Sequence, residues 1–303
     1  MLLFITQSYD PTADVVAAEL NRRSYPFFRL NRDLVQQYRV ALGPTAMQIA
    51  APNGRAIELE DVQSVFWGKP FQLYDILSLD SVEDRYRESL VQRLLHEIYS
   101  VLVRQGAWSL IDPCATNRVG KVAQMRSAIK YFSVPEWHVL NNELPATVEA
   151  GNWVSKVLST FPLSSTAAPA TVRVDPELLD QTYVWFLQRE ERADADVTVV
   201  FVTGKMFAYE FDRSCLTQPD WRVSKESTKS GRWKTIRLPK QVEDGIRSLM
   251  TDLCLAFGRI DFLRTGDCFH FLEINTSGQW AWLDEDGKDG LISAVVDGVI
   301  GKT

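Results

Sequence analysis

The sequence has few of the side chains that build the commonest metal and redox sites. Its four cysteines form no Cys-x-x-Cys pair, and its three histidines are dispersed along 303 residues. Zinc sites and histidine-dependent triads need such side chains in groups, so we expect neither here. We expect the cysteines to be reduced thiols that mostly fill the core of a cytoplasmic protein.

Other absences exclude broad classes of partner. The formal net charge is -6, so we expect no bulk attraction to nucleic acid or to an anionic membrane. No apolar run approaches the roughly 20 residues of a membrane span. The N-terminal segment reaches Gln7 and Asp10 too soon for a signal peptide. Residues 1–113 contain no Gly-rich phosphate loop, so any phosphate binding depends on individual lysines and arginines.

The first third of the chain has the pattern of an α/β domain. A strand at 2–5, a helix at 14–22 and a strand at 27–31 predict a parallel βαβ unit. Residues 47–59 predict a hairpin around Pro52-Asn53-Gly54. A strand at 65–67 and a long amphipathic helix at 83–105 follow. We take 1–113 as an N-terminal domain that forms one wall of a substrate cleft.

The remainder predicts an α+β part without internal repeats, which we divide into a central subdomain, 114–187, and a C-terminal subdomain, 188–303. The small residues of 162–170 indicate a mobile loop near the cleft. The expected elements are helices at 117–131, 241–257 and 291–300, strands at 151–157 and 185–190, and a hairpin formed by 197–202 and 206–211.

A second hairpin brings oxygen-bearing side chains together. Two runs rich in apolar residues flank the turn Thr265-Gly266-Asp267. Because side chains alternate along a strand, Glu273 and Asn275 face the same side, and Asp261 joins them if the register allows. Two carboxylates and an amide oxygen suit Mg²⁺. The alternative is an ordinary hairpin with polar residues on its solvated face.

In their order along the chain, these features resemble the ATP-grasp superfamily and, within it, the graspetide synthetases, which are microviridin-type peptide ligases. The resemblance covers nearly the whole chain. Its most specific part is Gly278-Gln279-Trp280-Ala281-Trp282, since a general ATP-grasp ligase shows only the preceding Asp…Glu-x-Asn pattern. Further matching residues are Thr6 to Asp10, Arg29-Leu30-Asn31, Asn117, Lys121, Gln124, Ala128, Lys156, Gln188 to Glu191, Asp196, Gly204 and Asp220-Trp221-Arg222.

The resemblance implies an ATP-grasp fold of class α/β, with ATP and Mg²⁺ held between two α+β subdomains. It implies a metal site at Asp261, Glu273 and Asn275. The nucleotide would be bound by Lys121, Lys156, Gln188, Arg189, Glu190, Glu191 and Asp196. Catalytic roles would fall to Arg213, Arg222 and Asp220, with the arginines holding an acyl phosphate.

Each assignment has a plainer alternative. A lysine on a strand, such as Lys156, is usually a solvated edge residue, and Arg213 and Arg222 suit surface ion pairs. Trp280 and Trp282 would wall the cleft against water, or would only pack in the core.

The implied reaction is ATP-dependent crosslinking of a precursor peptide. An Asp or Glu side chain becomes an acyl phosphate, and a Ser or Thr hydroxyl or a Lys amine then forms an ω-ester or ω-amide ring. We expect the central subdomain to recognise the leader peptide, and we expect a homodimer. The alternatives are a RimK-like amino-acid ligase and a degenerate ATP-grasp protein that only binds.

Three positions depart from the family pattern. Thr198 stands where an arginine is common, two residues after Asp196, so we expect either that Arg213 or Arg222 supplies the charge or that phosphate binding is weaker. Gly68 stands where an arginine often precedes a basic residue, which puts a substrate contact in doubt. Thr276 replaces a proline after Asn275, with little consequence for the metal.

Overall fold

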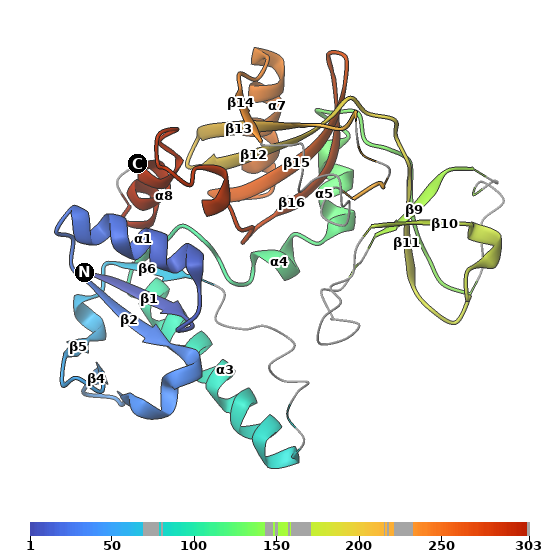
Figure 1. Ribbon diagram of the computed structural model, residues 1–303. Helices are drawn as coiled ribbons and strands as arrows, with labels where there is room; N and C mark the ends of the chain where they lie inside the picture. The colour runs from blue at the N-terminus through green and yellow to red at the C-terminus, as the bar shows by residue number, and fades with distance from the viewer. Residues whose placement is uncertain are drawn as a thin grey trace.

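The computed structural model describes residues 1–68, 79, 81–142, 148, 151–156, 158, 171–214, 216, 218–220 and 233–301, with the backbone alone of 116 and 117. Figure 1 shows three regions along this chain. An α/β region comes first, a small sheet is set apart on one side, and a larger sheet flanked by helices contains most of the C-terminal part. The predicted loop at 162–170, Arg222 and Cys215 lie outside the described residues.

A parallel sheet of order β2-β1-β6-β7 organises the N-terminal region. Every residue of β1 (Leu2–Thr6) is buried, as expected for a strand covered on both faces. It pairs in parallel with β2 (Phe27–Asn31) and with β6 (Ser64–Trp67), so the predicted βαβ unit is confirmed. The edge strand β7 is Trp108–Ser109.

Helices cover both faces of this sheet. The face with Leu3 and Ile5 packs against α3 (Val82–Arg104) and against the antiparallel sheet of β3 (Arg39–Leu42), β4 (Met47–Ala50) and β5 (Ala56–Glu58). The opposite face packs against α1 (Pro11–Arg22) and the terminal helix α8 (Leu291–Val299), which lie side by side in Figure 1. The C-terminal helix therefore fastens the N-terminal sheet to the rest of the protein.

The small sheet set apart in Figure 1 is antiparallel, with the order β10-β9-β11-β8. Its strand β11 continues two residues beyond position 187, where we placed a subdomain boundary. The boundaries at 113 and 187 remain predictions. The strands of this sheet are β8 (Trp137–Leu140), β9 (Trp153–Lys156), β10 (Val172–Val174) and β11 (Trp185–Arg189).

The C-terminal sheet is antiparallel, with the order β14-β13-β12-β15-β16. Both predicted hairpins are confirmed: β12 (Ala195–Val202) with β13 (Lys205–Asp212), and β15 (Phe257–Thr265) with β16 (Cys268–Asn275). Thr203 and Gly204 have φ of 45° and 93°, the left-handed pair that a two-residue hairpin turn requires. The edge strand is β14 (Lys234–Ile236).

Two predicted helices are wrong in their extent. The helix expected at 117–131 is two helices, α4 (Ala115–Arg118) and α5 (Lys121–Ala128), because Gly120 is extended and caps the second one. The helix expected at 241–257 is α7 (Lys240–Asp252). It ends because Cys254 is left-handed, with φ of 53°, and β15 then begins.

Other predictions about burial and about short strands were wrong or incomplete. Cys114, Cys254 and Cys268 are exposed, so they do not fill the core. Strands β3, β7, β8, β10 and β14 were not predicted; each has at most four residues. None of the helices in the described ranges has the length and apolar character that crossing a membrane requires.

A substitution at Gly258 tests how tightly β15 packs against its neighbours. A Cβ added there would lie 2.8 Å from Ile274 Cγ2 and 3.3 Å from Met250 Cε. We expect Gly258→Ala to lower the free energy of unfolding by about 1–3 kcal/mol, the usual cost of overpacking. Gly43→Ala is the control, because its Cβ would meet only Ala46 O at 3.7 Å. Urea denaturation of both variants measures the difference; equal stability would contradict the packing.

Candidate functional site

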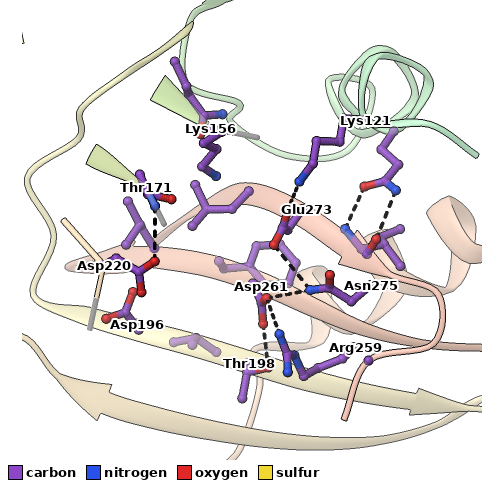
Figure 2. A pocket seen from close by; sticks show the side chains of 18 of the residues that line it. Lys121, Lys156, Thr171, Asp196, Thr198, Asp220, Arg259, Asp261, Glu273 and Asn275 are labelled. Carbon is purple, nitrogen blue, oxygen red and sulfur yellow. Dashed lines mark hydrogen bonds and ion pairs between the residues drawn. The ribbon is translucent and has the colours of Figure 1, made fainter. Parts of the chain in front are cut away.

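A cavity of about 700 Å³ lies where the small sheet, α5 and the C-terminal sheet meet. Figure 2 shows charged side chains directed into it from all three elements. Of the residues predicted for the site, all that the structure describes line this cavity: Lys121, Lys156, Gln188, Arg189, Glu190, Glu191, Asp196, Arg213, Asp220, Asp261, Glu273 and Asn275.

The predicted oxygen trio is assembled by the register of the β15–β16 hairpin. Asp261 is directly opposite Glu273, and a bulge follows between Asp261 and Phe262. The Asn275 side-chain amide donates to Asp261 Oδ2 over 3.0 Å and to Glu273 Oε1 over 3.4 Å (Figure 2). All three side chains therefore face the cavity from one side of the sheet, and their role as metal ligands remains a prediction.

The two predicted lysines come from different elements and meet at this trio. Lys121 is the first residue of α5, and its ammonium forms an ion pair with Glu273 (Figure 2). Lys156 ends β9 and is only partly exposed, so it is not a solvated edge residue. Burial alone would raise the pKa of Glu273, but the ammonium groups of Lys121 and Lys156 lower it to about 2.

Lys156 has the opposite balance. Burial of its ammonium lowers its pKa, and attraction to Glu273 offsets only part of that effect. Among the described residues, no acceptor or carboxylate lies within bonding distance of this ammonium. Within the described part of the chain, Lys156 is therefore a cavity cation that has no ion pair.

A glutamine that we gave no role fixes the backbone of the trio. Gln124 is 4% exposed, and its side-chain amide donates to Ile274 O over 3.0 Å and to Val119 O over 2.9 Å. Its Oε1 accepts the backbone N–H of Ile274 over 2.8 Å. Since Ile274 lies between Glu273 and Asn275, Gln124 holds both ligand candidates in position. The signal in the sequence was a glutamine about one helical turn after Lys121, and only the structure shows that it is buried.

The predicted catalytic group forms a second charged cluster. Nη1 of Arg213 donates to both Asp196 oxygens over 2.8 Å. Asp220 is 5% exposed and accepts the backbone N–H of Thr171 over 3.3 Å. Burial raises the pKa of Asp196 to about 6, although the Arg213 guanidinium acts against it. Arg213 is thus a cavity residue paired with an acid, and its catalytic role remains a prediction.

The predicted hinge residues line the other end of the cavity. Gln188 is 1% exposed, and its Nε2 has no hydrogen-bond acceptor among the described residues. The Arg189 guanidinium lies 4.4 Å from the centre of the Trp153 ring. Glu190 forms an ion pair with Arg173 over 2.7 Å. A buried amide with an unsatisfied donor provides a ready partner for an acceptor atom of a ligand.

The two tryptophans of the C-terminal motif do not act as a pair. Trp280 is 1% exposed and packs in the core with α1 and α8. Trp282 lines the cavity, with its ring 5.6 Å from that of Trp233. Core packing is therefore correct for Trp280, whereas Trp282 forms part of the cavity wall.

The structure also explains why position 68 is a glycine and not the arginine expected from the family pattern. A Cβ there would lie 2.7 Å from Asp10 Oδ2 and from Thr6 Oγ1, which are themselves hydrogen bonded over 2.6 Å. A larger residue would have to displace this buried pair.

Solved structures resemble this chain along its full length. The macrocyclase MdnC from Microcystis aeruginosa MRC, bound with precursor peptide MdnA, is 21% identical, with 100% of each chain covered and a TM-score of 0.82. A RiPP-associated ATP-grasp ligase from Chryseobacterium gregarium, in complex with ADP and a leader and core peptide, is 21% identical over 100% of this chain and 97% of its own, with a TM-score of 0.83.

A third structure agrees. The ATP-grasp ligase PsnB, complexed with minimal precursor, Mg and ADP, is 14% identical over 99% of this chain and 97% of its own, with a TM-score of 0.74. The chain has the ATP-grasp fold. A scan against protein-family models and a search of the curated proteins found no match. The predicted fold is thereby confirmed, and the ATP-grasp cavity contains the charged residues described above.

Lys156 provides a test of the electrostatics in this ATP-grasp cavity. Because the pKa of Lys156 is lowered from its ordinary value of 10.5, the unfolded state holds more protons between the two values. Stability should therefore rise with pH across that window. We expect Lys156→Met to abolish this rise and to increase the free energy of unfolding at neutral pH, because it removes an ammonium whose burial is unfavourable.

Lys130→Met is the matched control, because Lys130 is an exposed lysine paired with Asp252 over 2.9 Å. It should show no gain in stability. Urea denaturation from pH 7 upwards measures both variants; a destabilised Lys156→Met protein would contradict the unpaired cation.

Proposed function

We propose that this protein is an ATP-dependent carboxylate ligase that activates side-chain carboxylates of a peptide as acyl phosphates. The observation that carries the proposal is the convergence of Lys121 and Lys156, from α5 and β9, on the side chains of Asp261, Glu273 and Asn275 within one cavity. Ligation with ATP needs both kinds of charge, because phosphate must be neutralised while metal ions bridge its oxygens.

The donor set fits Mg²⁺. No cluster of three or more His, Cys, Asp or Glu side chains suited to a metal occurs in the described ranges. Two carboxylates and an amide oxygen would leave the other positions of an octahedral ion to water and phosphate, which is the usual arrangement for Mg²⁺. Asp261, Glu273 and Asn275 would hold the ion, which supplies Lewis acidity and charge neutralisation at the phosphates.

The lysines have a separate role in this proposal. The ammonium of Lys121 neutralises Glu273 through their ion pair. A polyphosphate between the two lysines would offer both of them stronger partners and would leave Glu273 free to bind a cation. Lys156, which has no close counterion among the described residues, would gain the most. The buried Gln188 amide and the hinge residues 189–191 would hold the nucleoside.

The chemistry proceeds in two displacements. A carboxylate oxygen of the substrate attacks the γ-phosphorus, the bond to the β-phosphate oxygen breaks, and ADP leaves. A hydroxyl or amine then attacks the acyl carbon, loses its proton, and releases inorganic phosphate. The peptide thereby loses the elements of one water for each bond formed. Arg213 is the candidate for holding the acyl phosphate, after exchanging its bonds to Asp196.

The finer assignment is a graspetide synthetase, which closes ω-ester or ω-amide rings in a precursor peptide. Its support is full-length similarity to a macrocyclase and to a ligase whose solved complexes contain such peptides. The small sheet of β8 to β11 is the proposed leader-peptide site. We propose a cytoplasmic location, which suits the free cysteines, and a homodimer, which light scattering can check.

Mass spectrometry tests the reaction directly. With ATP, Mg²⁺ and a candidate precursor peptide, we expect the peptide to lose the mass of one water per ring. Addition of an amino acid would instead raise the mass and would indicate a RimK-like ligase. An unchanged peptide, with no ATP consumed, would indicate a protein that only binds.

Two substitutions test the oxygen trio. We expect Glu273→Gln and Asn275→Ala to abolish ATP-dependent product, by at least about a hundredfold, because each removes a ligand from the metal site. Circular dichroism should show both variants folded. The control is Glu210→Gln, on β13, which removes an ion pair with Arg264 outside the cavity. Product formation at the wild-type rate in either trio variant would refute the metal assignment.

A further inference from the structure

Arg259 is a charged cavity residue that none of the roles above uses. It lies on β15 two residues before Asp261, so both side chains share one face of the sheet. Its Nη2 donates to Asp261 Oδ2 over 3.2 Å, and its Nη1 donates to the backbone oxygen of Gln279 over 3.0 Å. In Figure 2, Arg259 approaches Asp261 from the side away from Lys121 and Lys156.

Arg259 and Thr198 hold the same carboxylate from neighbouring strands. Thr198 on β12 is directly opposite Asp261, and Val200 is directly opposite Arg259. Thr198 and Arg259 are therefore diagonal neighbours on one face, close enough for long side chains to reach a common point. The Thr198 hydroxyl donates to Asp261 Oδ1 over 2.7 Å, and Arg259 donates to the other oxygen.

The guanidinium of Arg259 has donors to spare. A guanidinium carries five N–H groups, and the structure uses two of them in the bonds above. Its Nε is buried without an acceptor among the described residues, so its present contacts do not satisfy it. Its single bond to Asp261 is also longer than the bonds of Arg213 to Asp196, 2.8 Å each.

We propose that Arg259 binds phosphoryl oxygens in this cavity and supplies the positive charge that the family resemblance places at position 198. The inference rests on the proposed ligase function and deepens it. Thr198 is neutral and too short to reach beyond Asp261, whereas Arg259 reaches the same carboxylate with a charged fork that fits phosphate. With Lys121 and Lys156 on the opposite side of the trio, phosphoryl charge is then countered from two directions.

A purely structural role is the competing explanation. Arg259 connects β15 to the segment after β16 through Gln279, and a Cβ on Gly278 would lie only 2.9 Å from Arg259 Cβ. If Arg259 only connects these segments, its removal lowers stability, and a positive charge at position 198 cannot replace it. If it binds phosphoryl oxygens, the charge can be moved between the two diagonal positions.

The experiment therefore moves the charge. The variants are Arg259→Ala, the double variant Arg259→Ala with Thr198→Arg, and the control Arg264→Ala. Arg264 is on the same strand and pairs with Glu210 over 2.7 Å, but it lies outside the cavity. Calorimetric titration with a nonhydrolysable ATP analogue and with AMP, with and without Mg²⁺, separates phosphate contacts from nucleoside contacts. Turnover of a candidate precursor peptide at saturating ATP reports on the acyl phosphate.

We expect Arg259→Ala to weaken analogue binding, or to slow turnover at saturating ATP, roughly ten- to hundredfold, the value of a charge-assisted hydrogen bond. AMP binding should not change. Loss of analogue affinity indicates nucleotide phosphate as the partner, and slower turnover alone indicates the acyl phosphate. The double variant should recover most of the loss, and Arg264→Ala should match the wild type.

Wild-type binding and turnover in Arg259→Ala would overturn the inference, as would a folded double variant without recovery. If the double variant does not fold, Arg259→Lys and Arg259→Met decide: the charge-retaining variant must exceed the neutral one in binding or turnover. Failure of the wild type itself to bind the analogue with Mg²⁺ would instead refute the proposed ligase function.

Discussion

Charge balance inside one partly buried cavity is the constraint on which the site depends. Carboxylates and cations from α5, from strands of two sheets and from the adjoining loops converge there, and each would be costly to bury alone. Three pairs offset part of this cost, namely Lys121 with Glu273, Arg213 with Asp196, and Arg259 with Asp261, whereas Lys156 has no ion pair among the described residues. In the proposed reaction, a polyphosphate with its metal ion would exchange these partners, the phosphates binding the cations and the metal ion binding the carboxylates.

The fold keeps these charges in place through neutral contacts. The Gln124 side-chain amide binds both the N–H and the C=O of Ile274. The backbone of Glu273 and Asn275 is therefore held by contacts that do not involve their own side chains. Gly120 is extended and caps α5, which places Lys121 at the start of this helix and within reach of β16. The lysine of β9 belongs to a separate sheet, so its approach to the trio depends on how that sheet sits over the cavity.

The sequence was sufficient to predict the position of site residues where the local pattern of a strand and the chemistry of its side chains agree. Alternation along a strand placed Glu273 and Asn275 on one face. The register of the turn alone would pair Asp261 with Leu272, and the bulge between Asp261 and Phe262, which was not predicted, brings Asp261 opposite Glu273. The sequence was insufficient where a single backbone angle decided the outcome. The break before Lys121 and the end of α7 at Cys254 depend on φ and ψ values that composition does not specify.

Contacts between strands that are distant in the sequence could not be predicted either. We expected Arg213 or Arg222 to compensate for Thr198, because neither the pairing of Thr198 with Asp261 nor the diagonal position of Arg259 is visible before the strand order is known. The same holds for Gly68, whose neighbours Thr6 and Asp10 are distant in sequence. The residue types were enough to predict the chemistry of the site, whereas the contacts of each residue could be identified only from the fold.

A crystal structure with Mg²⁺ and a nonhydrolysable ATP analogue tests the central claim most directly. The account predicts the polyphosphate between the ammonium groups of Lys121 and Lys156, with the metal ion bound to oxygens of Asp261, Glu273 and Asn275. A nucleotide bound elsewhere, or one bound here while Lys121 keeps its ion pair with Glu273 and no metal contacts the trio, would contradict it.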